Sequence, residues 1–323
     1  MKSTKFWDLW EKYGIFAILI VTMTVFGILK PQTLAVNNLL TVLSRSAIIG
    51  ISACGMTFAI CAGGFDLSVG SIVGLSTCVF AANLPIMGII PATILTILIG
   101  ALCGVLNGLA ITKLKIQTFV ATLAIGMIIK GGALVYTQGA KQMISRSDNP
   151  EAKIFSQNVN VFGFQVQLMP LLMMIAIFVG GYLLYRYTRY GVFVRSIGSN
   201  EGSARTSGIA VDRTLIWVFV LTGVTASLSG LIRVSQLMQG SAVSGDGFEL
   251  DVITATILGG TALAGGKGNI WGSFVGAILL AMIRNGLNMV GLADEFQRLA
   301  IGLILLAALA ISGVQELSKE ARA

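Results

Sequence analysis

The chain has 323 residues, of which 55% are hydrophobic and 11% are charged, and its formal net charge at pH 7 is +8. A soluble domain of this length could not bury so much apolar surface in one core, so we predict an all-α, polytopic membrane protein. Histidine is absent and the four cysteines show no C-x-x-C spacing, so no metal or redox site is expected. The basic excess is typical of cytoplasmic loops rather than of nucleic-acid binding.

The first apolar run, Gly14–Leu29, follows three lysines and precedes no small-x-small cleavage site, so we expect it to be retained as a membrane span. A helix needs about 20 apolar residues to cross a bilayer core of about 30 Å. The apolar segments predict about ten transmembrane helices, which are, in chain order, 13–29, 47–62, 69–86, 91–112, 118–136, 168–187, 214–238, 252–264, 270–291 and 298–314.

Two of these segments, 47–62 and 252–264, are too short for a regular span, and a glycine pair directly follows each of them. Laid on each other without gaps, Gly63–Gly74 and Gly265–Gly276 match at six of twelve positions. Short, glycine-broken segments at corresponding positions of two halves point to a transport pathway. We therefore predict a parallel internal repeat with the pathway close to both glycine pairs.

The distribution of charge predicts the orientation. Segment 186–213 contains five arginines, whereas segment 239–251 contains three acidic residues and neither lysine nor arginine. The positive-inside rule places 186–213 and both termini, with Lys2, Lys5 and Lys12 at one end and Lys319 and Arg322 at the other, in the cytoplasm. Segments 137–167 and 239–251 are then predicted to be periplasmic loops.

Asp66 lies between two apolar segments, where a carboxylate is costly unless it is solvated, paired or used to cap a helix. Because Leu67 begins the next apolar run, we interpret Asp66 first as the N-cap of that helix. Direct contact of the carboxylate with a ligand or an ion is the alternative.

Three stretches of sequence are similar to those of a known family. Met56–Leu75 (MTFAICAGGFDLSVGSIVGL), Ile257–Gly268 (ILGGTALAGGKG) and Thr118–Gly132 resemble the permeases of ribose/galactose-type ABC sugar importers, and Leu258–Asn288 is most similar to the ribose and allose permeases. The resemblance implies one transmembrane domain over 1–323, with a type II ABC importer-like fold, in the bacterial inner membrane. The partners that it implies are a cytoplasmic ATPase, a periplasmic sugar-binding protein and a second permease copy, in contact with membrane lipid.

The chain has no Walker A motif, because its nearest approach, Thr261–Gly268, lacks the first glycine and the hydroxyl residue that would bind Mg²⁺. We therefore expect no enzymatic activity and no cofactor on this chain, with ATP and Mg²⁺ on the partner ATPase. The resemblance places a helix that couples to the ATPase in loop 188–213, with the residues Gly198, Asn200, Glu201, Ser203, Ala204, Arg205 and Gly208. Asn200 can cap that helix, and Glu201 would lie in its first turn. The alternative is a solvated basic loop with no partner.

Sugars commonly meet aromatic faces and amide or hydroxyl side chains, so Phe65, Asn107, Phe119, Asn285 and Asn288 are predicted pathway residues. Asp66 joins them through its alternative role, direct contact with a ligand or an ion. Asn107 could instead satisfy a neighbouring helix, and Phe119 could belong to the core. A self-sufficient secondary transporter or channel is the second functional hypothesis. Such proteins usually need ionisable residues within the membrane, and here the candidates besides Asp66 are Lys130, Arg233 and Arg284.

Overall fold

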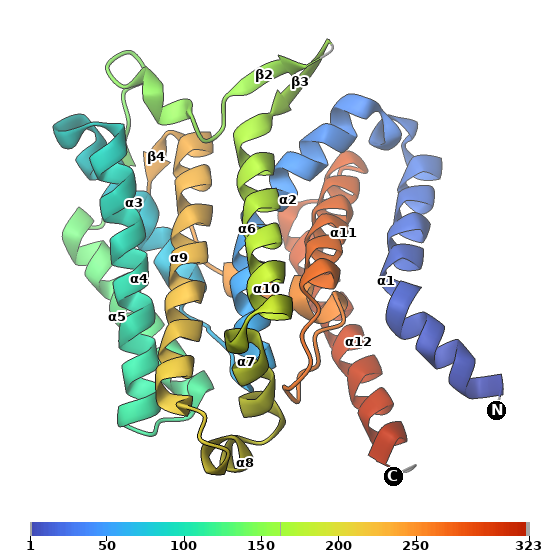
Figure 1. The fold of residues 1–323 in the computed structure, drawn as a ribbon. Coiled ribbons are helices and arrows are strands. Elements are labelled where there is room, and N and C mark those ends of the chain that lie inside the picture. The colour runs from blue at the N-terminus through green and yellow to red at the C-terminus, as the bar shows by residue number, and fades with distance from the viewer. Residues whose placement is uncertain (1, 162, 321–323) are drawn as a thin grey trace.

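The computed structural model describes residues 2–161 and 163–320, with side chains for 14–161, 163–293, 295–307 and 310. Over these residues the chain is mostly helical (Figure 1), and the α-helices are α1 (Lys2–Leu29), α2 (Val36–Cys61), α3 (Val69–Met87), α4 (Ile89–Lys113), α5 (Thr118–Thr137), α6 (Leu168–Tyr187), α7 (Arg189–Ser199), α8 (Glu201–Thr206), α9 (Val211–Leu237), α10 (Phe248–Leu258), α11 (Ile270–Met289) and α12 (Asp294–Glu320). The other elements are the 3₁₀ helices η1 (Pro31–Leu34) and η2 (Pro150–Lys153) and the strands β1 (Gln142–Met143), β2 (Asn158–Val161), β3 (Phe164–Gln167) and β4 (Gln239–Gly240).

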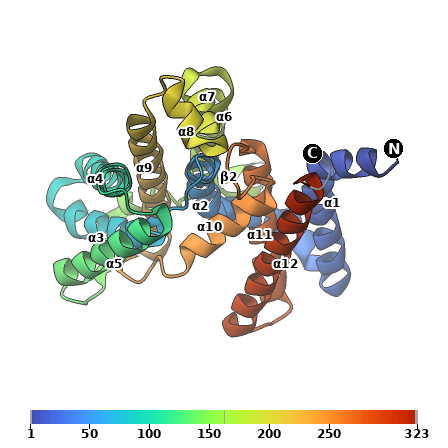
Figure 2. The ribbon, with the colours of Figure 1, turned by 90° about the horizontal axis from the view of Figure 1, so that it is seen from below.

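The long helices lie side by side and define two ends of the molecule (Figures 1 and 2). We call the end that carries α7 and α8 the α8 end. We call the opposite end, where β2 and β3 form an antiparallel hairpin, the hairpin end. The free ends of α1 and α12 both lie toward the α8 end, and β1 pairs antiparallel with β4 toward the hairpin end.

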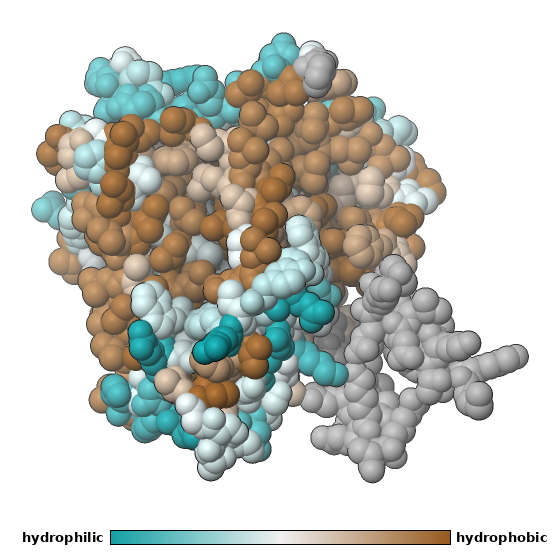
Figure 3. All heavy atoms as spheres, in the orientation of Figure 1, coloured by the Kyte–Doolittle hydropathy of each residue, from teal (hydrophilic) through white to brown (hydrophobic). Residues whose placement is uncertain are grey.

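Within the described residues, seven helices are long and apolar enough to cross a membrane: α2, α3, α4, α5, α6, α9 and α11. Their outward surface is apolar as well. On α4, exposed leucine and isoleucine side chains recur every three or four residues from Ile90 to Leu109, which places them on one face of the helix. Figure 3 shows hydrophobic side chains across the middle of one face of the molecule and hydrophilic ones at both ends. These features confirm a multi-pass membrane protein.

One of the two predicted short spans is wrong. Segment 47–62 is the second part of α2, which begins at Val36 and has 26 residues. Its first turns carry Asn37, Asn38 and Arg45, and these polar residues kept the sequence pattern from showing an apolar span. The other prediction is closer, since α10 has only 11 residues and ends at Leu258.

Helix α9 lies between α4 and α2 and packs most extensively on α4. The contact depends on glycines, because a Cβ atom on Gly104 would lie 2.6 Å from Val220 Cα and still closer to the Phe219 carbonyl oxygen. On the other side of the contact, a Cβ atom on Gly223 would collide with the backbone of Gly100. Small residues at such positions let two membrane helices approach each other closely.

Replacing Gly104 by Ala should therefore force α4 and α9 apart and lower the free energy of unfolding by about 1–3 kcal/mol, the range for overpacked cores. Gly180 on α6 is a matched control, since a Cβ atom there would meet nothing within 4 Å. Gly180→Ala should be neutral or slightly stabilising, because Ala favours a helix over Gly by up to about 1 kcal/mol. Thermal unfolding of the purified protein in detergent measures both changes, and equal melting temperatures for the two variants would contradict the assignment.

Candidate functional site

The two predicted glycine pairs meet at the α8 end. Gly63 and Gly64 follow α2, and Gly265 and Gly266 lie in the connection between α10 and α11. The Gly266 amide donates to the Cys61 carbonyl oxygen at 2.9 Å. Helix α7 closes this junction, because a Cβ atom on its Gly198 would lie 2.6 Å from the Gly266 nitrogen. The two glycine-rich segments that are similar in sequence therefore form two turns of the chain, and both turns contact Gly198 of α7.

Asn200 is the N-cap of α8, as predicted, and its Oδ1 accepts a hydrogen bond from the Ser203 amide at 2.8 Å. Of the predicted coupling residues, Glu201, Ser203, Arg205 and Gly208 are exposed, and Gly198, near the end of α7, is half-buried. Ala204 differs from the prediction that it faces a partner. It is only 3% exposed because it packs inward on the apolar core of its own chain.

Ion pairs connect α8 to the helices beside it. Arg205 donates to Glu201 at 2.9 Å and to Asp212, in the first turn of α9, at 2.6 Å. Asp212 also lies 3.7 Å from the ammonium groups of Lys113 and Lys115, which stand where α4 leads into α5. The hydrogen bonds accepted by Asp212 and Glu201 raise the pKa of Arg205, so its guanidinium keeps its charge. A displacement of α8 would therefore act on both α9 and the α4–α5 connection.

Asp66 and Asn107, predicted separately, are neighbours in one buried cluster. The Asp66 Oδ1 atom accepts from the Ser68 amide at 2.9 Å, from the Ser68 hydroxyl at 2.6 Å and from Asn107 Nδ2 at 3.4 Å. Its other carboxylate oxygen contacts the hydroxyl of Thr222, eleven residues into α9. Asp66 supports the turn before α3 as a cap would, although α3 begins at Val69 and its N-cap residue is Ser68. Asp66 and Asn107 are both fully buried, so neither lines an open path in this conformation.

The other four predicted pathway residues fall in two places. Phe65 is half-buried beside Asp66, and the Thr122 hydroxyl connects its carbonyl oxygen to α5, on which Phe119 is half-exposed. Asn285 lies toward the hairpin end, where its amide exchanges hydrogen bonds of 2.8 and 3.1 Å with Asn38 of α2. Asn288 is exposed one turn further along α11. The structure therefore brings together three of the six candidates, with Phe119 beside them.

Segment 239–251 is not the periplasmic loop that its charge predicted. After β4 it enters the bundle along α3, where Cβ atoms on Gly70 and Gly74 would collide with the carbonyl oxygens of Gly245 and Ala242. The acidic residues of this segment therefore lie among the membrane helices. Sequence analysis missed this because the positive-inside rule assigns a side of the membrane from charge and does not show whether a segment packs back into the bundle.

The acidic residues of this segment pair with cations on the helices around them. Lys130, about two-thirds of the way along α5, contacts both carboxylate oxygens of Asp246 at 2.7 and 2.8 Å. Arg284 of α11 donates to Asp251 of α10 at 2.5 Å. Ionisable groups at this depth are costly and are usually functional. We therefore treat these pairs as part of the candidate site, although only their basic members were noted as membrane charges in the sequence.

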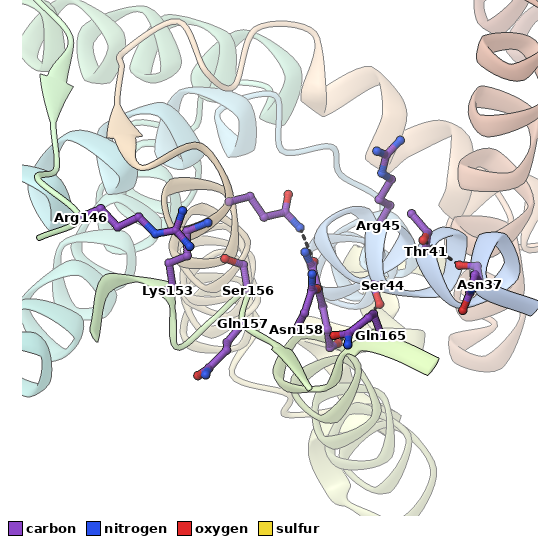
Figure 4. A pocket seen from close by; sticks show the side chains of 12 residues that line it. Asn37, Thr41, Ser44, Arg45, Arg146, Lys153, Ser156, Gln157, Asn158 and Gln165 are labelled. Atoms are coloured by element: carbon purple, nitrogen blue, oxygen red, sulfur yellow. Dashed lines mark hydrogen bonds between the residues drawn. The ribbon is translucent and has the colours of Figure 1, made fainter. Parts of the chain in front are cut away.

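A polar cavity of about 770 Å³ opens at the hairpin end (Figure 4). Ser44 and Ser156 are buried in it, and Gln236 donates to Gln167 at 3.0 Å across it. Arg45, Arg146 and Lys153 give it positive charge, and its lining contains no carboxylate. The full lining is Asn37, Thr41, Ser44, Arg45, Arg146, Lys153, Ser156, Gln157, Asn158, Gln165, Gln167 and Gln236. Such a cavity suits a hydrophilic or acidic partner rather than an apolar ligand.

Comparison with known proteins identifies the family. Residues 38–309 match the family described as branched-chain amino acid transport system / permease component, and the chain belongs to it. Over 311 residues the chain is 36% identical to the ribose import permease protein of Bacillus subtilis (strain 168), covering 95% of this chain and 94% of that protein. It is 33% identical to the D-allose transport system permease protein of Escherichia coli (strain K12) over 309 residues, covering 94% and 91%.

A third relative is the L-arabinose transport system permease protein of Escherichia coli (strain K12), which is 32% identical over 329 aligned positions covering 98% of this chain and 95% of that protein. No solved structure matches the chain. The similarity to sugar-importer permeases that the glycine motifs predicted is confirmed over nearly the full length.

The Asp66 cluster makes a testable prediction. Asp66→Asn keeps an oxygen that can accept from Ser68, so the folded yield and melting temperature should stay close to those of the wild type. Asp66→Leu leaves the buried amide and hydroxyl donors of Ser68 without their acceptor, at roughly 1–3 kcal/mol for each. The exposed Asp148 is the control, and Asp148→Leu should have little effect. Full stability of Asp66→Leu, with import lost equally in both Asp66 variants, would point to a role for the charge in the pathway.

Proposed function

We propose that this chain is the permease subunit of an ATP-driven importer that moves a monosaccharide, such as ribose, allose or a similar pentose or hexose, across the bacterial inner membrane. The observation that carries the proposal is the polar segment 240–247, whose Asp246 pairs with Lys130 among apolar helices. Irregular backbone survives at membrane depth only where protein buries it or where it lines water. The family description names amino acids, but relatives that align with almost the whole chain are named for sugars, and these support the choice.

The proposed topology has ten spans with both termini in the cytoplasm. To the seven long apolar helices it adds α12, the short α10 and α1, which is apolar over Gly14–Leu29, where its side chains are described. The basic α8 end would face the cytoplasm, and both terminal helices point toward it. The side chains of Lys2, Lys5, Lys12 and Lys319, and all of Arg322, lie outside the described residues.

A labelling experiment tests this orientation. The four native cysteines are buried, so an impermeant thiol reagent should report only an introduced one. In intact spheroplasts, a cysteine replacing the exposed Ser147 in the β1–η2 loop should react, and a cysteine replacing the exposed Ser207 after α8 should not. Ser244 is a poorer position, since it lies half-buried in the segment that enters the bundle. The reverse pattern of labelling would overturn the proposed topology.

The proposed pathway lies between two copies of the chain. In a single chain, the side chains of Lys130 and Asp246 are 36% and 50% exposed. Charges on a lateral surface at this depth cannot face lipid without a large cost. A second copy placed over this face would exclude lipid and enclose a hydrated path. A homodimer supplies the same face twice, and lipid would contact the apolar surface seen in Figure 3.

The proposed energy source is a separate ATPase that binds ATP and Mg²⁺ and docks on the cytoplasmic 188–213 loop. Support comes from α8, whose exposed residues stand beyond the bundle and whose Arg205 is paired with α9. A periplasmic sugar-binding protein would deliver the sugar at the hairpin end. Closure of the ATPase would then rock the helices between two access states as rigid bodies.

Reconstitution tests the function as a whole. Proteoliposomes that contain the permease, its ATPase and its binding protein should accumulate labelled ribose, allose or arabinose only when ATP is present on the ATPase side. Accumulation by the permease alone, driven by an ion gradient, would instead establish the secondary transporter. Import of branched-chain amino acids without import of any sugar would contradict the proposed substrate class.

Substitution at Ser203 tests the coupling surface. Ser203 is exposed on α8 and its side chain makes no hydrogen bond with other described residues, so Trp fits the isolated chain but would obstruct a partner at this surface. Ser203→Trp should reduce co-purification of the ATPase roughly tenfold, which corresponds to a loss of about 1.4 kcal/mol in binding. Ser147→Trp at the hairpin end is the matched control and should leave co-purification unchanged. Recovery of the ATPase at the wild-type ratio with Ser203→Trp would favour a solvated loop without a partner.

A further inference from the structure

We propose that Arg233, Asp251 and Arg284 form a binding site inside the bundle for a neutral sugar, recognised through neighbouring hydroxyl groups. The site rests on the proposed function and refines it by locating the contact with the substrate. The three residues come from three helices, α9, α10 and α11. Their assembly therefore depends on the tertiary structure and not on a local motif.

Asp251 is the centre of the proposed site. Its side chain is 12% exposed and accepts a hydrogen bond from Arg284 Nη2, whereas the Arg284 side chain is 41% exposed. Arg233, near the end of α9, adds a second positive charge that acts on Asp251 electrostatically, without a hydrogen bond between the two side chains. A solute that reaches Arg284 would therefore meet a guanidinium group and the carboxylate within the field of a second cation.

The arginines have hydrogen-bonding capacity that their own chain does not use. The Nε atoms of Arg233 and Arg284 are buried and have no hydrogen-bond partner among the described residues, and Arg233 makes no hydrogen bond there with any of its nitrogens. A buried donor without a partner costs roughly 1–3 kcal/mol. An oxygen-rich ligand would remove that cost, so the hydrogen-bonding capacity of the two arginines is better satisfied when such a ligand is bound.

The Lys130–Asp246 pair shows what a closed ion pair looks like in the same region. Its ammonium group contacts both oxygens of one carboxylate, and no polar atom of either side chain is among the buried, unpaired ones of the described residues. An ion pair whose polar atoms are satisfied in this way is typical of a structural contact between helices. The Asp251 group differs, because its carboxylate contacts only one guanidinium group, that of Arg284, and both arginines keep a buried Nε atom without a partner among the described residues.

The chemistry of the group favours a neutral polyol. Each sugar hydroxyl both donates and accepts, so one can donate to Asp251 while its neighbours accept from the planar guanidinium groups. The charges around the group are Glu249 on α10 and Arg298 on α12, one of each sign, which leaves a surplus of one positive charge. A sugar acid is thus the natural competitor in the test.

The test compares ribose with 2-deoxyribose, which lacks one hydroxyl, in proteoliposomes with the ATPase and the binding protein. The ratio of kcat/KM for the two sugars is measured for the wild type, Arg233→Gln, Arg284→Gln and the exposed control Arg189→Gln. The binding protein is the same in every preparation, so its own preference cancels. We expect at least one of the two site variants to lower the preference for ribose by about tenfold, because a lost hydrogen bond to a charged group is worth roughly 1.5–3 kcal/mol. The control should keep the wild-type ratio.

Several results would overturn the inference. Equal loss of import for both sugars, with the ratio unchanged, would make the group a structural ion pair. Better import of a sugar acid than of ribose by the wild type would contradict a neutral ligand. If Arg233→Gln does not fold, Arg233→Lys keeps the charge but not the planar fork and should still lower the ratio; an unchanged ratio there also counts against the site. Absence of ATP-dependent import of any sugar by the wild type would refute the proposed function, and this site with it.

Discussion

The close fit between segment 240–247 and helix α3 determines most of the interior of this protein. Gly70 and Gly74 present bare backbone on one side of α3, and the carbonyl groups of Ala242 and Gly245 occupy the space that side chains would otherwise fill. Because of this contact, a polar stretch of chain runs among membrane helices instead of outside them. It also fixes where α10 begins, and so where Asp246 and Asp251 meet their basic partners.

Helix α9 connects the regions that the proposed transport cycle needs. Near its start Asp212 holds Arg205 of α8, and in its middle Thr222 contacts the buried Asp66. In its last turns, the positive charge of Arg233 acts on Asp251. Its glycine contact with α4 makes the two helices one packed unit. A force applied at α8 therefore reaches a rigid rod that extends to the proposed sugar site, which is the kind of element that rigid-body switching requires.

The sequence was sufficient for features that depend on composition or on local geometry. Hydropathy located the long spans, and the Asn200 cap followed from a side chain acting three residues away. The glycine repeat was visible because identical residues recur, and in space the two glycine pairs meet at Gly198. The predictions that failed share another cause, since each depends on where a side chain or a segment points in the folded chain. A sequence does not show that Ala204 points inward, that 239–251 turns into the bundle, or that Asn285 and Asp66 lie in different parts of the molecule.

The shortness of α10 has an electrostatic consequence. A helix carries partial positive charge at its N-terminus, and α10 begins inside the bundle with Glu249 and Asp251 in its first turn. A helix that spanned the whole membrane would place that partial charge at the water interface, where solvent screens it. Because α10 begins within the bundle, the partial positive charge at its N-terminus offsets part of the negative charge of its own carboxylates. Arg284 still pairs with Asp251, but Arg233 makes no hydrogen bond among the described residues, so its guanidinium group remains available to whatever passes through the membrane.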